Sequence, residues 1–428
     1  MNKIFNPNKS SWTSLVKRPV YSLDSVKDVV DEIFINIELY GDKSLIEYTK
    51  KFDNVELNNL KVSSEKINNS ENDIDKDLKE SINVAFNNIY KFHKNQVIDF
   101  NKIETTPGVL CWQEKRAIEN VGLYIPGGTA PLFSSVLMLA IPAMIAKCKN
   151  IVLCSPPNKS GELHPAILYC AKLCKVDTVI CVGGAQSIAA MSIGTETVPK
   201  VNKIFGPGNQ FVTYAKLKSI NFNTAIDMPA GPSELLVLAD KYANPSYIAS
   251  DLLSQAEHGP DSQVIFVSLS KSLINEVEKC INDQVKSLDR IDFINKSISN
   301  SKLVFFEDKT MAIDFINLYA PEHYIINVQD ESFFVDNIVS AGSVFIGNYT
   351  PESAGDYASG TNHTLPTNGN AKQYSGVNLD SFQKTITFQK ISKTGLLNIS
   401  KTVETMAKAE GLQAHKNAVS IRVKDLKS

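Results

Sequence analysis

The sequence predicts an α/β fold with mainly parallel sheets. From about residue 121 onward, short apolar runs alternate with stretches of helical periodicity, which is the rhythm of strands joined by helical crossovers. Glycine-rich joints follow several apolar runs: Gly127-Gly128, Gly183-Gly184 and Gly206-Pro207-Gly208-Asn209. Each joint alone is best explained as a tight turn. Three joints within about 90 residues favour a ligand-facing edge, because ligands of open α/β sheets bind beyond the carboxyl ends of strands.

The individual elements follow from local periodicity and composition. The stretch from Asn54 to Asn95 is rich in Asn, yet Leu78, Ile82 and Phe86 recur at helical spacing and predict an amphipathic helix. Helical patterns also cover residues 247–254, 310–319 and 397–409. The predicted strands are residues 151–154, 178–182, 203–205, 234–239, 263–267, 302–306 and 343–346.

Length and composition narrow the class of protein. A chain of 428 residues has room for about two to four domains, and 43% hydrophobic with 21% charged residues is typical of a soluble globular protein. The net charge of −2 predicts neither a nucleic-acid surface nor binding to an anionic membrane. The longest apolar run, residues 136–146, contains Pro142 and is too short to span a bilayer.

The amino terminus and the cysteines indicate a cytoplasmic protein. Residues 1–7 lack the apolar core of a signal peptide. The seven Cys residues form no CxxC pair, so neither a disulfide framework nor a thiolate zinc site is predicted. Neither the GxGxxG fingerprint nor the GxxxxGK[ST] loop occurs, which argues against an ordinary dinucleotide fingerprint and against a P-loop.

The segment Gln255-Ala-Glu-His258-Gly-Pro-Asp261 is a candidate metal site. Gly259-Pro260 should end the preceding helix, and Gln255 and His258 should share a face of its last turn. An amide oxygen and an imidazole on one face can bind one divalent ion. Judged by spacing alone, a polar helix end with a histidine favoured by the helix dipole is the simpler interpretation.

Ionisable side chains gather at five separated places in the sequence. Four of the six histidines lie there, whereas His93 and His164 lie on helical patterns that look like surface. A nitrogen and oxygen ligand set without thiolates suits Zn²⁺, and also Mn²⁺ or Co²⁺. The five places are Gln255/His258, Glu322/His323, Asp356, His363 and Glu410/His415.

Four of these places have an informative setting. Glu322 and His323 stand between a helix and an apolar run, where they could handle protons or form only a capping or surface pair. Asp356 and His363 lie in residues 347–370, a predicted long structureless loop of a kind that is usually functional in a compact domain. Glu410 and His415 are five residues apart, with Gly411 between them, so they need a helix break and suggest a carboxy-terminal arm.

Longer motifs resemble those of the histidinol dehydrogenase family. The resemblance covers nearly the whole chain and is weakest between about Asn54 and Asn101. Its motifs are Val121-Gly-Leu-Tyr124-Ile-Pro-Gly-Gly128, Phe205-Gly-Pro-Gly-Asn209, Asp227-Met-Pro-Ala-Gly-Pro-Ser-Glu234, Asp251-Leu-Leu-Ser-Gln-Ala-Glu-His-Gly-Pro-Asp-Ser262, Pro321-Glu-His323, Ser353-Ala-Gly-Asp-Tyr-Ala-Ser-Gly-Thr-Asn-His363 and Ala409-Glu-Gly-Leu-Gln-Ala-His415-Lys-Asn-Ala-Val.

The resemblance implies a cytoplasmic homodimer with one Zn²⁺ per subunit. Its activity would be the oxidation of L-histidinol through histidinaldehyde to L-histidine with two NAD⁺, the last steps of histidine biosynthesis. It implies Glu322 and His323 as the acid/base pair and Tyr124, Gln186 and Asn209 as NAD contacts. The implied zinc ligands are Gln255, His258, Asp356 and, from the partner subunit, His415. The implied substrate contacts are Ser233, His323, Glu410 and the same four metal ligands.

The resemblance also implies the organisation of the fold. Two related, incomplete Rossmann-like domains would be joined to small amino- and carboxy-terminal helical segments. The first domain would combine residues 21–120 and 233–377 and hold the metal and substrate. The second, residues 121–232, would hold NAD. Residues 1–20 and 378–428 would form an amino-terminal arm and a carboxy-terminal dimerisation arm.

Without the resemblance, two other interpretations remain open. A zinc hydrolase would explain the candidate ligands but not the glycine-rich joints. A non-catalytic protein that binds a metal or a metabolite would explain the α/β pattern but leave Glu322 and His323 without a role. Formation of NADH from histidinol and NAD⁺ would exclude both.

Overall fold

The computed structural model describes residues 1–19, 24–98, 100–127, 131–229 and 231–428. The chain forms two compact units. One unit contains residues 1–95 and 118–382, and the other contains residues 96–117 and 383–428. Gly128, part of a predicted ligand-facing joint, and Ala230, part of a motif, lie outside the described residues.

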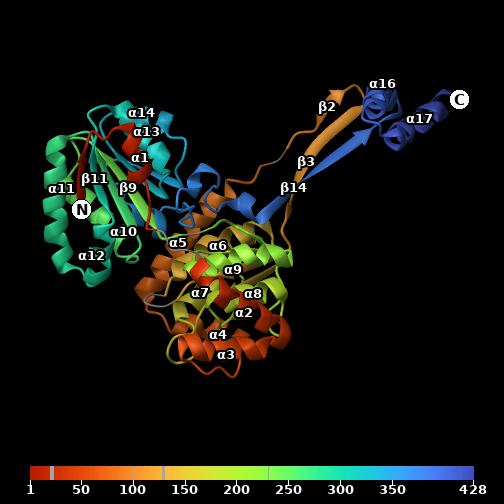
Figure 1. The fold of residues 1–428 in the computed structure, drawn as a ribbon. Helices are drawn as coiled ribbons and strands as arrows, with labels where there is room; N and C mark the ends of the chain where they lie inside the picture. Colours follow the sequence, from red (N-terminus) through yellow and green to blue (C-terminus); the bar gives the residue numbers. More distant parts are fainter. Residues whose placement is uncertain (20–23, 99, 128–130, 230) are drawn as a thin grey trace. The chain divides into compact units, whose positions relative to one another are not determined.

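A six-stranded parallel sheet forms one half of the larger unit (Figure 1). Strand β9 lies at its centre, with Glu234 in register with Gln263 of β10 and Leu235 in register with His323 of β12. In spatial order the strands are β1 (Asn2–Phe5), β11 (Lys302–Phe305), β10 (Gln263–Ser268), β9 (Glu234–Ala239), β12 (His323–Asn327) and β13 (Ser343–Ile346).

Helices cover both faces of this sheet (Figure 1). Strand residues alternate between the two faces, so Leu235 and Val237 pack in one core while Leu236 and Leu238 pack in the other. One face carries α10 (Pro245–Ala256), α11 (Lys271–Gln284) and α12 (Ile291–Ser299); the other carries α1 (Lys9–Leu15), α13 (Lys309–Tyr319) and α14 (Glu331–Asn337).

A five-stranded parallel sheet organises the other half of this unit. Its strands, in spatial order, are β6 (Thr178–Ile180), β5 (Asn150–Cys154), β4 (Asn120–Tyr124), β7 (Lys203–Phe205) and β8 (Ala225–Ile226). One face packs on α5 (Lys76–Lys94), α6 (Phe133–Ala146) and α7 (Pro165–Leu173); the other packs on α2 (Asp24–Tyr40), α3 (Asp42–Asp53), α8 (Gly184–Ile193) and α9 (Gln210–Ser219).

The helices of residues 24–94 pack with residues 121–232. Val30, Ile33 and Phe34 of α2 share a core with α8 and α9, and Ile82 and Ile89 of α5 share a core with α6. These contacts favour a domain in which residues 24–94 join the five-stranded sheet, whereas the predicted division joined residues 21–120 to residues 233–377. Chain order carries no sign of this pairing, because the apolar faces of α2 and α5 would suit either sheet. The division into domains stays a prediction.

The smaller unit is an antiparallel sheet followed by a helical hairpin. Strand β3 (Val109–Ala117) lies between β14 (Gln383–Ile391) and β2 (Ile103–Thr106). Helix α16 (Lys393–Ala409) packs on α17 (Gln413–Lys427). Within the described chain α17 buries none of its side chains, and Leu397, Met406 and Ile421 of this hairpin are exposed.

The predicted fold class is confirmed: the structure is α/β with mainly parallel sheets and helical segments near both ends. The strands predicted at residues 203–205, 234–239 and 343–346 have the predicted bounds. The antiparallel sheet was not predicted, because β14 is exposed along most of its length and lacks an apolar run. In the described residues, no helix combines the length and apolar character needed to cross a membrane.

The prediction that residues 347–370 form a structureless loop is wrong for residues 352–357. Residues Glu352–Tyr357 form helix α15, which follows the extended residue Pro351 and is capped at its carboxyl end by Ala358. The helix is six residues long, which is too short to show a periodic apolar pattern. A further helical turn, η4, covers Asn370–Lys372.

Candidate active site

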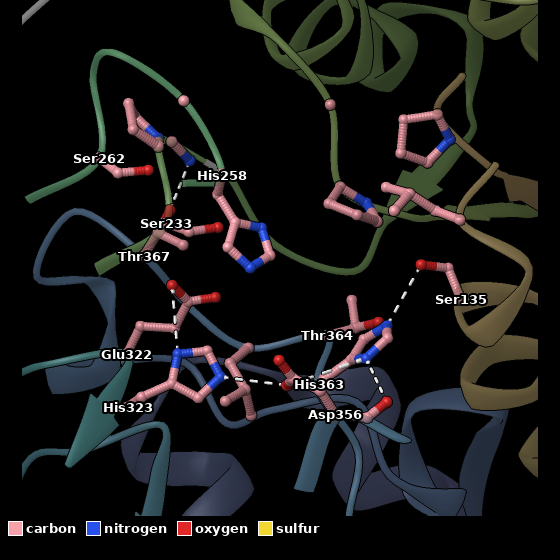
Figure 2. A pocket seen from close by; sticks show the side chains of 18 of the residues that line it. Ser135, Ser233, His258, Ser262, Glu322, His323, Asp356, His363, Thr364 and Thr367 are labelled. Atoms are coloured by element: carbon pink, nitrogen blue, oxygen red, sulfur yellow. Dashed lines mark hydrogen bonds and ion pairs between the residues drawn. The ribbon is translucent and has the colours of Figure 1, made fainter. Parts of the chain in front are cut away.

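A pocket of about 320 Å³ lies in the larger unit (Figure 2). Part of its lining comes from the carboxyl ends of strands β4 and β7 in the five-stranded sheet, including Pro126 and Gly206-Pro207-Gly208-Asn209. The remainder includes the residues at or before the amino ends of β9, β10 and β12, among them Ser233, Ser262 and His323. The two sheets therefore present opposite strand ends to one pocket.

Glu322 and His323 form a buried pair at the amino end of β12. The backbone N–H of Glu234 donates to Glu322 Oε2 at 2.8 Å, and His323 Nδ1 lies 3.3 Å from the carbonyl oxygen of Glu234. His323 Nδ1 is 3.6 Å from Glu322 Oε2. The first residue of the neighbouring strand thus contacts both members of the predicted acid/base pair.

Two further carboxylates surround His323. Its Nδ1 is 3.7 Å from Glu352 Oε1, and its Nε2 points toward Asp356 with 3.7 Å to Oδ1 (Figure 2). Burial alone would lower the pKa of His323, but the negative charges of Glu352, Glu322 and Asp356 outweigh burial and raise the pKa well above its ordinary value. This imidazole therefore carries a proton unless positive charge is brought nearby.

The carboxylates respond to the same environment in opposite ways. Burial, followed by the charges of its acidic neighbours, raises the pKa of Glu352 well above its ordinary value although His323 opposes the change. Burial also acts to raise the pKa of Asp356, but its close contact with His323 and the other nearby imidazoles outweigh burial and lower it. Of these two carboxylates, Asp356 is therefore the one that ionises more readily, and its charge faces the imidazole of His323.

Three side chains could hold a metal ion together. One nitrogen of His258 and one oxygen each of Glu352 and Asp356 all lie within 4.8 Å of one another. Gln255, at the end of α10, is fully buried, and neither of its side-chain polar atoms has a hydrogen-bond partner among the described residues. A buried amide without partners is costly unless something binds it. The donor set therefore fits a divalent cation. Gln255, His258 and Asp356, three of the zinc ligands implied by the resemblance, all line this pocket.

Glu352 is a candidate ligand that sequence reasoning missed. It is buried on α15 and contacts His323. The spacing of Glu352 and Asp356, four residues apart, would put both carboxylates on one helical face. That signal was lost because the segment was interpreted as a loop.

The other predicted substrate residues divide between the two units. Ser233 lines the pocket immediately before β9. Glu410 caps α16, and His415 lies in the first turn of α17 after Gly411, whose φ is +76°. The predicted break between them is confirmed. Both side chains are exposed in the smaller unit, and their role at the site stays a prediction.

The predicted cofactor residues lie at the carboxyl ends of three strands in the five-stranded sheet. Tyr124 ends β4 and is buried, which raises the pKa of its hydroxyl to about 12 despite a hydrogen bond from the backbone of Gly184. Gln186 is buried in the first turn of α8, after β6. Asn209 follows β7 and lines the pocket, and its Oδ1 accepts from the N–H groups of Phe211 and Val212 at 3.0 and 3.1 Å. Tyr124 and Gln186 are not among the lining residues.

A buried ion pair shapes the Gly206 joint. Lys216 Nζ lies 2.5 Å from Asp227 Oδ1 and donates to the carbonyl oxygen of Gly206 at 2.8 Å. The N–H of Gly206 donates to Asp227 Oδ2 at 2.8 Å. Gly206 has a φ of +127°, and a Cβ there would lie 2.1 Å from the carbonyl oxygen of Tyr124. The joint therefore requires glycine. Its four residues line the pocket at the carboxyl end of β7, where an α/β sheet commonly binds a cofactor.

His363 lines the pocket between Ser135 and Asp356. Its Nε2 lies 3.2 Å from Ser135 Oγ and its Nδ1 lies 3.0 Å from the carbonyl oxygen of Asp356 (Figure 2). Burial lowers the pKa of His363, which keeps the imidazole neutral. His93 was predicted to be at the surface, and that is wrong: it is fully buried, because the loop residue Asn362 packs over it with Nδ2 3.3 Å from its Nε2.

Comparison with known proteins identifies relatives across the full length. The family model described as histidinol dehydrogenase matches residues 16–423. The histidinol dehydrogenase of Bacteroides thetaiotaomicron is 52% identical over 427 residues, covering 100% of both chains. The chloroplastic histidinol dehydrogenase of Arabidopsis thaliana is 51% identical over 424 residues, covering 98% of this chain and 91% of the relative.

A solved structure agrees with these sequence matches. The crystal structure of histidinol dehydrogenase from Elizabethkingia anophelis superposes with a TM-score of 0.98 at 51% identity, covering 100% of this chain and 99% of that one. Family model, sequence relatives and fold all agree over the region that builds the pocket. The chain belongs to the histidinol dehydrogenase family.

Proposed function

We propose that this protein oxidises L-histidinol through L-histidinaldehyde to L-histidine with two NAD⁺, as the last steps of histidine biosynthesis. The observation that carries the proposal is the pocket: a buried Glu322/His323 pair lies beside side chains that could hold a metal ion, and the glycine joint of residues 206–209 lines the same pocket. A two-step alcohol oxidation needs a base that accepts the substrate proton and a site for the cofactor that accepts the hydride, and a bound metal ion can orient the substrate between them.

The residues that would hold a zinc ion are Gln255, His258 and Asp356, with His415 of the partner subunit completing the set. Glu352 is close enough to join them or to bind the substrate amine. When bound, one zinc ion per subunit would orient the imidazole and amine of the substrate and offset part of the carboxylate charge around His323.

His323 takes the proton of the substrate hydroxyl in the first step. An alcohol releases hydride readily only as its oxyanion forms, so a base must lie within hydrogen-bond reach of the hydroxyl. The contact of His323 Nδ1 with the carbonyl oxygen of Glu234 leaves Nε2 facing Asp356, which lines the pocket. Tyr124, Gln186 and Asn209 would hold NAD⁺, which when bound would supply the hydride acceptor, chemistry that no side chain provides.

Glu322 activates water for the second step. The aldehyde must be hydrated before a second hydride can leave, and the Glu322 carboxylate is positioned by the N–H of Glu234 to take a proton from water. His323 then serves as base once more. A thiol nucleophile is the usual alternative for aldehyde oxidation, but none of the described residues that line the pocket is a cysteine.

The smaller unit supports a homodimer with shared active sites. Its hairpin leaves Leu397, Met406 and Ile421 exposed, and such apolar side chains favour a protein partner. A second copy would supply Glu410 and His415 to the pocket of the first. A soluble dimer of this kind, with free cysteines, suits the cytoplasm.

Incubation of the protein with histidinol and NAD⁺ tests the activity. We expect NADH absorbance to appear with two equivalents per histidinol, and a zinc-replete sample that stays silent would contradict the proposal. Treatment with a chelator should lower turnover, and readdition of zinc should restore it. Full turnover of zinc-depleted protein would contradict the orienting role of the metal.

Co-expression of two inactive variants tests the shared site. His258→Ala and His415→Ala damage different parts of the predicted ligand set, so a heterodimer keeps one intact site if His415 crosses to the partner. We expect part of the activity to return in the heterodimer. No recovery in a purified heterodimer would contradict the shared site while leaving the chemistry untouched.

A further inference from the structure

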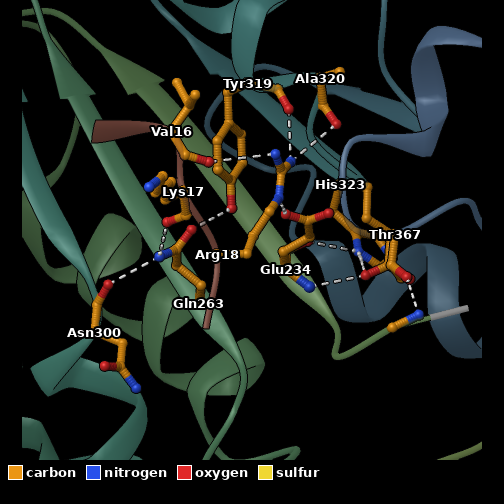
Figure 3. Close-up of polar contacts among 12 residues, drawn as sticks. Val16, Lys17, Arg18, Glu234, Gln263, Asn300, Tyr319, Ala320, His323 and Thr367 are labelled. Carbon is orange, nitrogen blue, oxygen red and sulfur yellow. Dashed lines mark hydrogen bonds and ion pairs between the residues drawn. The ribbon is translucent and has the colours of Figure 1, made fainter. Parts of the chain in front are cut away.

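Arg18 lies between Glu234 and the carbonyl groups of Tyr319 and Ala320 (Figure 3). Its Nε donates to Glu234 Oε2 at 2.6 Å, and its Nη2 donates to the carbonyl oxygen of Tyr319 at 2.6 Å and contacts that of Ala320 at 3.4 Å. The side chain of Arg18 is 12% exposed and that of Glu234 is 2% exposed. Loss of one member of such a buried pair is costly, because the other charge is then left buried without a partner.

The two groups that Arg18 binds, Glu234 and the Tyr319–Ala320 turn, each adjoin the acid/base pair. Glu234 uses its N–H to hold Glu322 Oε2 and its carbonyl oxygen to contact His323 Nδ1. On the other side, Tyr319 and Ala320 are followed immediately by Pro321-Glu322-His323. Ala320 has a φ of +53°, a left-handed conformation that costs energy for a residue with a Cβ and persists only when its surroundings hold it.

The surroundings of Arg18 fix its own position. The guanidinium carbon lies 3.9 Å from the centre of the Tyr319 ring. The Tyr319 hydroxyl donates to Gln263 Oε1 at 3.1 Å, and Gln263 Nε2 donates to the carbonyl oxygens of Lys17 and Asn300 at 3.2 and 3.0 Å. Arg18 is thus stacked, bonded and enclosed, which suits a planar group with donors in a fixed geometry.

We propose that Arg18 is a positioning residue for the proposed reaction, clamping Glu234 to the Tyr319–Ala320 turn so that Glu322 and His323 keep their catalytic geometry. The inference rests on the proposed function. Arg18 touches neither partner of the acid/base pair. It acts through the backbone of Glu234 and through the turn that precedes Glu322.

A purely structural role would be to attach the amino-terminal segment to the sheet. A matched control separates the two roles, because Lys9 also ties this segment to α13 through Asp314, at 2.8 Å, in an exposed ion pair. Lys9→Met should therefore loosen the attachment without touching the clamp. The test variants are Arg18→Met, Arg18→Lys, Glu234→Gln and the double variant Arg18→Met/Glu234→Gln.

Steady-state kinetics with histidinol and NAD⁺ give the first measurement. Because a misplacement of about 1 Å can cost about 100-fold in rate, we expect Arg18→Met to lower kcat by roughly 10- to 100-fold while both KM values change by less than about threefold. Arg18→Lys should lose less, because one ammonium can reach Glu234 or the carbonyls but cannot form the fork. Lys9→Met should keep wild-type kcat.

The double variant distinguishes position from stability. Removing both charges leaves no unpaired buried charge, so thermal stability should recover relative to either single variant. The kcat should stay low, because nothing then holds Glu234 to the turn. Recovery of kcat together with stability would overturn the inference, as would a wild-type kcat in Arg18→Met or a loss in Lys9→Met equal to that in Arg18→Met.

Hydrogen exchange gives a second measurement that needs no turnover. The amide of Glu234, which donates to Glu322, should exchange faster in Arg18→Lys and Arg18→Met than in the wild type or Lys9→Met. Unchanged exchange would overturn the clamp. If Arg18→Met does not fold, Arg18→Lys decides by both measurements. If wild-type protein forms no NADH, the proposed function fails, whereas the exchange result still judges the clamp.

Discussion

The two parallel sheets meet the pocket with opposite strand ends, and the chemistry at those ends differs accordingly. At the carboxyl ends of β4 and β7 the chain turns through glycines, and the Gly206 joint packs too closely on the carbonyl oxygen of Tyr124 to admit a Cβ. At the amino ends of β9 and β12 the pocket is lined by ionisable side chains, with Glu322 and His323 both in contact with the backbone of Glu234.

The difference shows how strand polarity shapes a site. Carboxyl ends of strands pass into helix N-termini, where backbone N–H groups and small residues favour an anionic cofactor. Amino ends of strands offer free N–H groups before the ladder begins, and here one of them, the N–H of Glu234, positions a carboxylate. We call these two sides of the pocket the carboxyl edge (the ends of β4 and β7) and the amino edge (the starts of β9 and β12). Backbone shape determines what the carboxyl edge can bind, whereas the balance of charges determines what the amino edge can bind.

The largest effect should come from removing the base at the amino edge. His323→Asn keeps a polar side chain but cannot accept the substrate proton at neutral pH, so kcat should fall by about 100- to 10,000-fold. Stopped-flow detection of NADH checks this for each hydride step. His164→Asn is the control, because His164 caps α7 and Asn caps equally well. Hydride transfer at wild-type speed in His323→Asn would show that another group is the base.

A charge deletion at the carboxyl edge should mainly cost stability. Lys216 and Asp227 are almost fully buried, at 1% and 2% exposed, so Lys216→Met leaves an unpaired buried carboxylate and should lower the free energy of unfolding by about 3 to 5 kcal/mol. Denaturant titration measures the change. Addition of Asp227→Asn should recover part of the loss. A double variant less stable than Lys216→Met would contradict the pairing.

A methyl group at the glycine joint tests backbone shape with no change in charge. Gly206→Ala meets both an unfavourable φ of +127° and the carbonyl oxygen of Tyr124, so we expect about 2 to 4 kcal/mol of destabilisation and a raised KM for NAD⁺. Gly347→Ala is matched, since Gly347 has a φ of +90° but nothing within 4 Å of a Cβ, and should cost about 1 kcal/mol. Equal losses measured by thermal unfolding would show that the close contact is unimportant.

The carboxyl edge was easier to predict from sequence than the amino edge. Glycine joints after apolar runs are local signals, and the strand at residues 203–205, which leads into the Gly206 joint, has the predicted bounds. Arg18 escaped prediction because its role depends on contacts with residues far away in the chain, such as Glu234, 216 positions later. Glu352 escaped because its segment was interpreted as a loop, which hid its helical spacing to Asp356. Motif resemblance pointed to Glu322 and His323, but no pattern could indicate that Glu234 holds both through its backbone.

A smaller effect tests the charge balance of the amino edge through pH. Asp251 lies one turn before Gln255 on α10, and burial raises the pKa of its carboxyl to about 7. In the unfolded chain an Asp has a pKa of about 3.9. The folded state therefore binds the proton more tightly, so the stability due to this group is complete below about pH 4 and is lost as pH rises through about 7.

Asp251→Asn should remove this loss. The free energy of unfolding of the wild type, measured with a chelator present, should fall relative to that of Asp251→Asn by about 2 kcal/mol between about pH 5.5 and about pH 7. Asp283→Asn, which removes an exposed carboxylate from α11, controls for the loss of a charge. Parallel curves for the wild type and Asp251→Asn would mean that solvent reaches Asp251 in the folded state. Water would then stabilise the ionised carboxyl of Asp251 in the folded state, and no bound cation would be needed to balance its charge.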